Sequence, residues 1–276
     1  MLKNKSILVI LMLLCTNVFA QVKQPTNSDS NFVFYKLIKG KFNAVNVDML
    51  GNIYVVTETN QLKKLNSNGD SLSTFNDVKK FGTVTNIDVS NPLKVLLFYK
   101  NYGNVVFLDR QLVFRNNFNL KQQNLFKVKA IANAYDNNTW IYDEQDFKIK
   151  KIKDNGTTIS ETTDLRQVFD AAPMPTKIID NNNSLYLYDA QKGLFVFDYY
   201  GSLKQKILLK DWSNIAVSNN NVLGISGDLL NSYDLKTLVT KVYKLPSFFN
   251  SYKDIIALNG KIYLLKKTAV EIYTIL

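Results

Sequence analysis

The chain has 276 residues, of which 46% are hydrophobic and 21% charged, and only 11 are glycine and 5 proline. This composition excludes a collagen-like or largely disordered chain and allows a sizeable core in a single all-β unit. There is no histidine and only one cysteine, Cys15, which excludes Ser-His-Asp triads, histidine metal sites and intramolecular disulfides.

Residues 1–20 have the pattern of a secretory signal peptide. Lys3 and Lys5 supply a charged start, residues 7–14 are apolar, and Val-Phe-Ala ending at Ala20 matches a cleavage site. The apolar stretch is far shorter than the ~18–20 residues that a membrane span needs. We therefore expect cleavage after Ala20, a periplasmic or outer-membrane-associated protein, no transmembrane segment and no nucleic-acid partner.

Cys15 offers a competing interpretation as a lipoprotein anchor. Lipoprotein signals need a small residue before the cysteine, and Leu14 stands there, so the anchor is not favoured. Residues 21–30 are expected to form a polar lead-in. Without the two lysines of the leader, 32 basic residues remain against 23 acidic ones, a net charge of +9 that favours anionic partners.

The rest of the chain repeats one pattern of short strands. Its first copy contains "VDMLGNIYVVTETNQLKKLNSNGDSLSTF" (47–75), in which apolar strands alternate with Asp/Asn/Gly turns. Six copies begin at Phe42, Val84, Val128, Pro175, Ser213 and Lys253. Their starts are 42, 44, 47, 38 and 40 residues apart, a spacing typical of four-stranded propeller blades.

Equivalent positions of the copies carry equivalent residues. The second strand has a hydrophobic–tyrosine pair at Ile53-Tyr54, Ile141-Tyr142, Leu185-Tyr186 and Ile262-Tyr263. The turn after the third strand begins with a short polar side chain that can bond the turn backbone, namely Asn66, Asp109, Asp154, Asp198 and Asp234. The third strands also carry lysines, at Lys63, Lys64, Lys148, Lys150, Lys151 and Lys153. Strand alternation is expected to place at least some of them on a solvated outer face, and a docking patch for an anionic surface is the alternative.

The last copy reaches only its third strand at Leu276, which leaves an unpaired sheet edge. The alternating segment "NFVFYKLIKG" (31–40) can supply the missing strand. We predict an all-β fold: a single six-bladed β-propeller domain over residues 31–276, with the ring closed by the N-terminal strand (about 31–40), which completes the last blade.

The stretches 47–75 and 185–203, "LYLYDAQKGLFVFDYYGSL", resemble blades of the NHL and gluconolactonase-like (TolB-like) six-bladed propellers. The leader and the Asn/Lys-rich body are similar to exported members from Bacteroidota-type bacteria. The resemblance implies the fold and leaves the function open, because such propellers include enzymes, binding modules and scaffolds.

The enzymes that this resemblance implies are lactonases with a divalent metal held in the central channel by acidic and asparagine side chains. The inner-strand candidates for such ligands are Asn43, Asn46, Asp48, Asn86, Asp88, Asn133, Asp180, Asn214 and Asp254. Several of these aspartates stand beside turns, where capping explains them, and no inner strand contains glutamate. We therefore predict no catalytic residue, no metal and no cofactor, and keep a metal-dependent lactonase-like hydrolase as the alternative.

Three of the loops that lead into inner strands are longer than closure of the ring requires: residues 116–127, 164–175 and 246–252. Exposed apolar clusters with a polar rim are typical of interaction sites, although such side chains can also fold back onto the blades. The predicted binding residues are the rings of Phe118, Phe126, Phe169, Phe248, Phe249 and Tyr252, flanked by Lys121, Lys127, Arg166 and Lys253.

The expected function is therefore that of an exported, non-catalytic propeller that binds a protein or ligand, or acts as a scaffold, in the cell envelope. The expected partner is another envelope protein or an anionic envelope component. The chain would act as a monomer or as one subunit of a hetero-complex.

Overall fold

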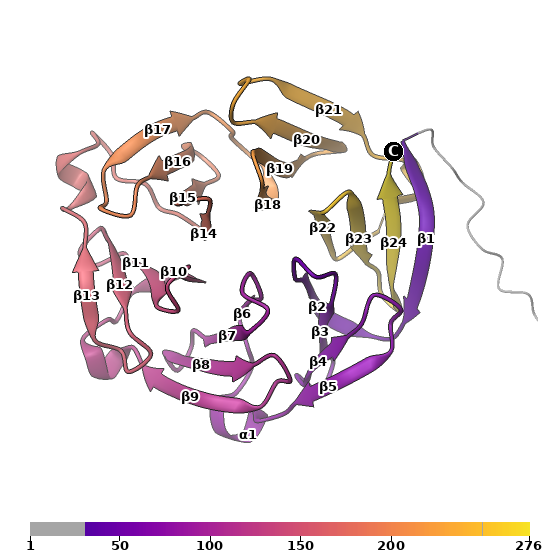
Figure 1. The fold of residues 1–276 in the computed structure, drawn as a ribbon, viewed down its shortest axis with the longest axis horizontal. Coiled ribbons are helices and arrows are strands. Elements are labelled where there is room, and N and C mark those ends of the chain that lie inside the picture. The colour runs from indigo at the N-terminus through magenta and orange to yellow at the C-terminus, as the bar shows by residue number, and fades with distance from the viewer. Residues whose placement is uncertain (1–30, 250) are drawn as a thin grey trace, which may run out of the picture.

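Six four-stranded antiparallel sheets surround a central channel (Figure 1). The computed structural model describes residues 31–249 and 251–276. The predicted signal peptide, the cleavage site after Ala20, Cys15 and the lead-in 21–30 lie outside this part of the chain. The prediction of an all-β, six-bladed propeller is confirmed.

The first three blades are numbered in chain order from the innermost strand outward. Blade 1 consists of β2 (Phe42–Val47), β3 (Ile53–Thr57), β4 (Leu62–Leu65) and β5 (Ser71–Phe75). Blade 2 consists of β6 (Asn86–Asp88), β7 (Lys94–Tyr99), β8 (Asn104–Asp109) and β9 (Phe114–Asn119). Blade 3 consists of β10 (Val128–Asn133), β11 (Thr139–Asp143), β12 (Lys148–Ile152) and β13 (Thr158–Glu161).

The remaining blades continue the ring. Blade 4 consists of β14 (Lys177–Asn181), β15 (Ser184–Asp189), β16 (Gly193–Phe197) and β17 (Leu203–Ile207). Blade 5 consists of β18 (Ser213–Ser218), β19 (Asn221–Ser226), β20 (Leu229–Asp234) and β21 (Thr240–Lys244). Blade 6 combines β22 (Asp254–Leu258), β23 (Lys261–Leu265) and β24 (Ala269–Ile275) with β1 (Phe32–Lys39) from the other end of the described chain.

Pairing of β1 with β24 closes the ring. The two strands run antiparallel, from Phe32 opposite Ile275 to Lys39 opposite Ala269, with an irregularity after Phe34. Figure 1 shows the indigo β1 beside the yellow β24. Closure by a strand at residues 31–40 is confirmed.

In the described part of the chain, the helices are single turns in the loops between blades: α1 (Val78–Phe81) and the 3-10 turns η1 (Lys121–Gln123), η2 (Leu165–Gln167) and η3 (Ser247–Phe249). No helix within the described ranges is both long enough and apolar enough to cross a membrane.

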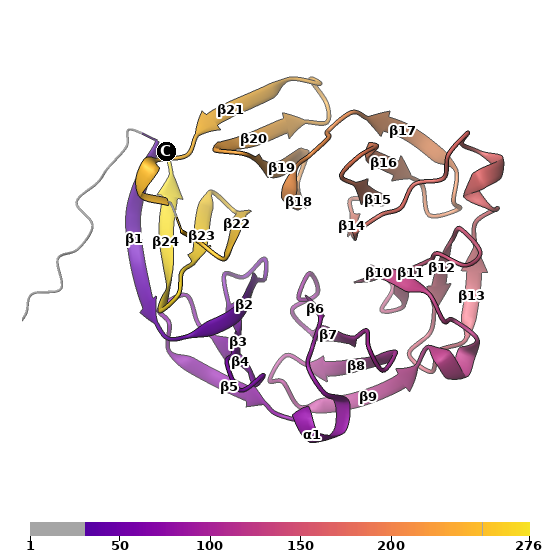
Figure 2. The ribbon, with the colours of Figure 1, turned by 180° about the vertical axis from the view of Figure 1, so that it is seen from behind.

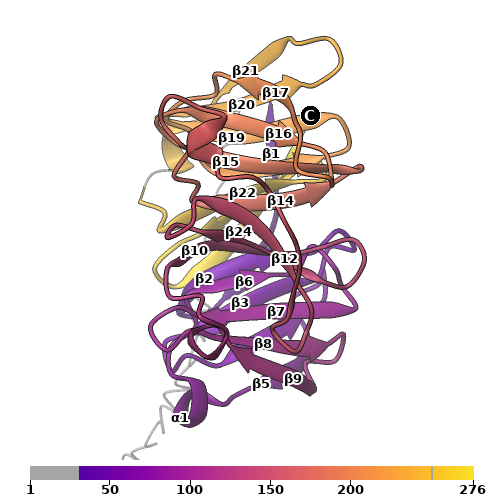
Figure 3. The same cartoon turned by 90° about the vertical axis from the view of Figure 1, so that its left-hand side faces the viewer.

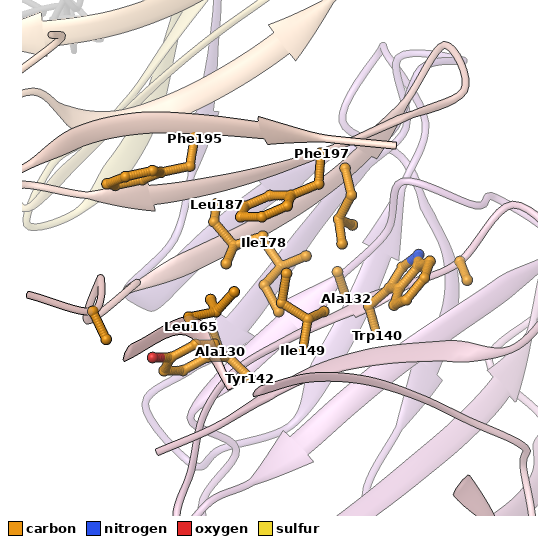
Figure 4. Packing of buried hydrophobic residues seen from close by; sticks show 13 residues of the cluster. Ala130, Ala132, Trp140, Tyr142, Ile149, Leu165, Ile178, Leu187, Phe195 and Phe197 are labelled. Carbon is orange, nitrogen blue, oxygen red and sulfur yellow. The ribbon is translucent and has the colours of Figure 1, made fainter. Parts of the chain in front are cut away.

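The hydrophobic core is divided into six clusters, each between two neighbouring blades. Figure 4 shows the cluster between blades 3 and 4, where Trp140 and Tyr142 lie near Leu187 and Phe197. The middle strands of a blade are covered on both faces by adjacent blades. Their sequences are therefore continuous apolar runs, as in "IYVV" of β3, where all four residues are buried.

Three of the third-strand lysines do not lie on a solvated face. Lys64, Lys150 and Lys151 are each 7% exposed, because the third strand lies between blades and only the fourth strand forms the outer rim. Each amine has an acceptor. The Lys64 Nζ donates to the carbonyl oxygen of Arg110 at 2.8 Å, and Lys150 and Lys151 form ion pairs.

The polar residues after the third strand cap the turns as predicted, with one exception. Oδ1 of Asp109 accepts the backbone N–H groups of Gln111 and Val113, and Asn66, Asp198 and Asp234 make equivalent pairs of bonds. Asp154 instead forms an ion pair with Lys94 of the neighbouring blade, at 2.6 Å.

Candidate functional site

The loops between blades all lie on one face of the ring, which we call the loop face. The inner strands run in the same direction, so the connections into them gather on one side, where α1 is also found (Figure 2). In the edge-on view of Figure 3, α1 lies at one side of the disc. The loop face is formed by residues 40–41, 76–85, 120–127, 162–176, 208–212, 245–249 and 251–253.

Two predicted aromatic anchors are wrong, because their rings belong to the core. Phe118 is 6% exposed and packs against Phe107 with 5.9 Å between ring centroids, since residues 116–119 continue strand β9 instead of forming a loop. Phe249 is 2% exposed and packs against Phe32 and Tyr273, at 5.4 and 4.6 Å. Their loss would therefore destabilise the fold, by about 3–5 kcal/mol for a buried phenylalanine changed to alanine.

Three other predicted rings are half-buried against the blades. Phe169 meets Phe195 edge to face at 5.1 Å. Phe248 packs on Phe249 at the same geometry and distance, and Tyr252 packs against the same core cluster. These side chains have mostly folded back onto the blades, so only part of each ring faces solvent.

Two of the predicted cations are already engaged. The Arg166 Nε donates to both carboxylate oxygens of Asp164 at 3.0 Å, and the guanidinium lies 4.6 Å from the centre of the Phe147 ring. Lys253 is exposed and its Nζ donates to the carbonyl oxygen of Phe42 at 3.3 Å.

The remaining three predicted residues lie together. Lys121, Phe126 and Lys127 line a hollow of about 190 Å³, and Phe126 is 57% exposed. Lys100, which the sequence analysis did not select, lines the same hollow from the loop after β7. We call this set the basic hollow.

The basic hollow has little negative charge of its own. Its one acidic residue is Glu144, which forms a salt bridge with Lys129 at 3.3 Å. Lys100 and Lys127 have no salt bridge with any residue that the structure describes, and the Lys121 Nζ donates to the carbonyl oxygen of Asn101 at 3.3 Å.

The inner-strand aspartates that could serve a channel metal are largely used in structural bonds. Asp48 is 1% exposed and accepts bonds from the backbone of Leu50 and Asn52. Asp88 accepts the backbone N–H groups of Ser90 and Asn133, the second from the next blade.

Asp180 likewise bridges two blades. It accepts the backbone N–H of Tyr135, the indole N–H of Trp140 and the hydroxyl of Tyr199. Within the described ranges, no group of three or more acidic, histidine or cysteine side chains could hold a metal ion.

The central channel is the larger cavity, with a volume of about 530 Å³. Lys177, Asn214 and Asp254 lie at or next to the first residues of β14, β18 and β22, so three consecutive blades bring them to the loop-face end of the channel. The Lys177 Nζ donates to the carbonyl oxygen of Ile215 at 2.6 Å. Lys177 was not predicted from the sequence, because a single lysine at a strand start has no distinctive spacing.

The channel environment favours the neutral form of both ionisable groups at this end. Enclosure by the walls lowers the pKa of the Lys177 ammonium, against the opposing charges of Asp88 and Asp254. Burial raises the pKa of Asp254, against hydrogen bonds from the Ile255 N–H and the Asn214 side chain and the charge of Lys177.

No protein-family model matches the sequence, and no curated protein matches it. Solved structures match the fold. Virginiamycin B lyase from Staphylococcus aureus has a TM-score of 0.60 and 11% identity, with 89% of this chain and 100% of that chain covered. A Bacteroides fragilis protein described as exported has a TM-score of 0.58 and 10% identity, with 92% and 98% covered.

A third similar structure is the WD40 domain of Pan2 from Neurospora crassa, with a TM-score of 0.56, 10% identity, and 86% and 82% covered. At these identities the similarity shows a shared β-propeller fold alone. Membership of the NHL or gluconolactonase-like group stays a prediction.

Proposed function

We propose that this chain is an exported, non-catalytic β-propeller that binds an anionic component of the cell envelope at the basic hollow. The observation that carries the proposal is that Lys100, Lys121 and Lys127 line one hollow together with the exposed Phe126. A protein partner, which the sequence analysis also allows, would meet the same surface through an acidic patch.

Charge and rigidity both support binding at this place. The lysines provide positive charge that attracts phosphate, sulfate or carboxylate groups, and the net charge of +9 that remains without the two leader lysines draws anions towards the protein. The exposed Phe126 adds apolar contact area beside the charges. Because the loops are carried by a rigid ring, little ordering is needed on binding.

The residues of this chain argue against catalysis, both by a chemistry like that of the similar lyase and by a lactonase-like chemistry. An alanine variant of the Staphylococcus aureus lyase that lacks a histidine is described as catalytically inactive, and this chain contains no histidine to supply such a group. The lactonase-like alternative needs free inner-strand carboxylates, whereas Asp88 and Asp180 already join neighbouring blades.

Export is supported by the signal-peptide pattern and by the likeness to the exported Bacteroides fragilis propeller. The intact mass of the protein purified from its own cells tests it. A chain that begins at Gln21 is expected, and a chain that begins at a lipid-modified Cys15 would contradict it.

Binding can be measured by cosedimentation with phosphatidylglycerol vesicles and by retention on heparin, in parallel with neutral phosphatidylcholine vesicles. The variant Lys100→Gln, Lys121→Gln and Lys127→Gln is expected to weaken binding at least about tenfold. The matched control makes the same change of charge at three exposed lysines of blade 5, in Lys236→Gln, Lys241→Gln and Lys244→Gln.

The control is expected to retain most of the binding. Equal losses in both variants would mean that only net charge attracts the anion, and would remove the basic hollow as the site. Failure of the unmodified protein to bind either anionic probe would contradict an anionic partner.

A further inference from the structure

The loop-face end of blade 2 carries more lysines than those of the basic hollow. Lys79 and Lys80 of α1 are exposed, as are the three lysines of the hollow. Figure 2 shows α1 at the outer edge of the ring, beside β9. None of these five lysines forms a salt bridge with a residue that the structure describes.

The turn between β7 and β8 joins α1 to the basic hollow. A Cβ atom at Gly82, directly after α1, would lie 2.7 Å from the ring of Tyr102. A Cβ atom at Gly103 would lie 3.2 Å from Cγ of Lys121. The backbone N–H of Leu120 donates to the carbonyl oxygen of Gly103 at 2.8 Å. We call this continuous region the blade-2 surface, and it consists of residues 79–82, 100–103 and 120–127.

The blade-2 surface combines positive charge with two exposed rings. Tyr102, beside α1, is 60% exposed, and Phe126, in the hollow, is 57% exposed. Asp77, directly before α1, and Glu144, in the hollow, supply negative charge, and Glu144 is paired with Lys129. The five lysines outnumber these carboxylates, so the surface attracts anions through all of its parts.

The shape of this surface fits a broad partner better than a small molecule. The hollow has a volume of about 190 Å³, below the ~300–1,000 Å³ of typical small-molecule sites. Lysines are attracted to an anionic bilayer, and aromatic rings enter the boundary between its headgroups and acyl chains. A lysine can keep its amine at the headgroups while its stem lies along apolar groups. A soluble polyanion would use the lysines but leave both rings in water.

We propose that the blade-2 surface docks on an anionic phospholipid bilayer, with the rings of Tyr102 and Phe126 at the boundary between headgroups and acyl chains. This inference rests on the proposed function and names the anionic component as a membrane surface. The lysines of α1 and of the hollow contact the lipid phosphates. Blade 5, opposite blade 2 in the ring, points away from the membrane (Figure 1).

Tryptophan substitutions test the contact with lipid. Tyr102→Trp and Phe126→Trp are each mixed with phosphatidylglycerol vesicles whose acyl chains carry bromine, which quenches tryptophan inside the bilayer. Each variant is expected to lose at least about half of the added fluorescence. The matched control is Tyr135→Trp, because Tyr135 is 63% exposed but lies after β10, on the opposite face, and it is expected to keep its fluorescence. The unmodified chain gives the background of Trp140 and Trp212.

Lysine variants test whether the surface extends beyond the hollow. Lys79→Gln plus Lys80→Gln leaves the hollow intact and is expected to weaken binding to phosphatidylglycerol vesicles about tenfold. The control Lys236→Gln plus Lys241→Gln removes the same charge from blade 5 and is expected to retain most of the binding. Brominated phosphatidylcholine vesicles, which have no net charge, are expected to leave the added tryptophans unquenched.

Binding to phosphatidylglycerol vesicles without quenching of Tyr102→Trp and Phe126→Trp would overturn the proposal. So would equal quenching of Tyr135→Trp, or equal losses in the two lysine variants. Retention on heparin without binding to vesicles would identify a soluble polyanion as the partner. The basic hollow would then remain an anion site, and only the bilayer would be excluded. Loss of both kinds of binding would contradict the proposed function itself.

Discussion

Buried charged side chains hold blade 3 together. The Lys150 Nζ lies 2.8 Å from Asp143 and 2.5 Å from Asp146. Its neighbour Lys151 points to the other face of the strand, where it pairs with Asp136 at 2.8 Å and lies 4.5 Å from the centre of the Trp140 ring. Such groups stabilise the fold only as complete sets, since one removed partner leaves the other buried and uncompensated.

Lys150→Met is therefore expected to lower the free energy of unfolding by about 3–5 kcal/mol, because the Asp143 side chain, 3% exposed, would lose its counterion. The control is Lys148→Met, on the same strand as Lys150, which breaks a more exposed pair with Glu161 of β13. It is expected to lower the free energy of unfolding by at most about 1 kcal/mol. Urea unfolding at pH 7 measures both. Similar losses in the two variants would show that the buried pair has no special weight.

The carboxyl group of Asp136 predicts a dependence of stability on pH. Burial acts to raise its pKa, but hydrogen bonds from Lys151 and Asn138 and the charge of Lys151 outweigh it, so the pKa is lowered. A carboxylate with a lowered pKa stabilises the fold fully above its unfolded-state pKa of about 3.9, and this contribution disappears as the pH falls through the folded value.

Asp136→Asn is accordingly expected to be less stable than the unmodified protein at pH 7, and the difference should shrink at about pH 3 and below. Thermal unfolding across this pH range gives the measurement. A difference that stays constant with pH would show that the charge of Asp136 contributes nothing.

At the scale of elements, the ring depends on one strand that is remote in sequence. β1 covers the edge of β24, and its first residue, Phe32, is fully buried in the cluster between blades 5 and 6. An uncovered β24 would present unpaired backbone groups over residues 269–275. Both the hydrogen bonds and the core packing of blade 6 thus depend on β1.

Deletion of the chain through Lys39 is expected to leave a protein that aggregates or unfolds at low urea concentration. A synthetic peptide of residues 31–40 should restore cooperative unfolding by adding itself to β24, whereas a peptide of the same composition in scrambled order should not. Size-exclusion chromatography and urea unfolding provide the readout. An unaltered transition in the deleted chain would contradict the closing role.

At the scale of the whole molecule, the closed ring brings the two ends of the described chain together. The backbone N–H of Leu276 donates to the carbonyl oxygen of Asn31 at 3.0 Å. The six core clusters have the same plan, each between adjacent blades, so the ring has no unique starting blade. Any blade could therefore be the one that is completed by a strand from the other end of the chain, if the chain began and ended within that blade.

A circular permutant tests this. Residues 31 and 276 would be joined by a short Gly/Ser linker, and new ends opened at the exposed turn 67–69, so that β5 closes blade 1 as β1 closes blade 6 in the native order. This permutant is expected to keep cooperative unfolding. A second permutant opened at 120–127, between complete blades, has no closing strand and should unfold at a lower temperature. Equal melting temperatures would show that strand exchange between the ends of the chain adds no stability.

Much of the fold was predictable from local patterns, because blades repeat the same burial. The Ile-Tyr pair of β3 and its equivalents in β11, β15 and β23 lie on middle strands that are buried on both faces. The capping residues of four turns act within five residues of chain, a range over which sequence is informative. The site was less predictable: of ten predicted residues, only Lys121, Phe126 and Lys127 gather at one hollow.

The sequence by itself determined the number of blades, the strand that closes the ring and the absence of histidine chemistry, because repeats, alternation and composition are properties of the chain. Only the tertiary structure decided that Phe118 and Phe249 are core, that Lys150 and Lys151 are paired inside a blade, and that Lys177 lines the central channel. The reason is physical. Burial and ion pairing depend on which strands and turns come together. Phe249 packs on Phe32 from the other end of the described chain, and the pairs of blade 3 join a strand to side chains of other strands and turns, so no local pattern records which neighbour a side chain will meet.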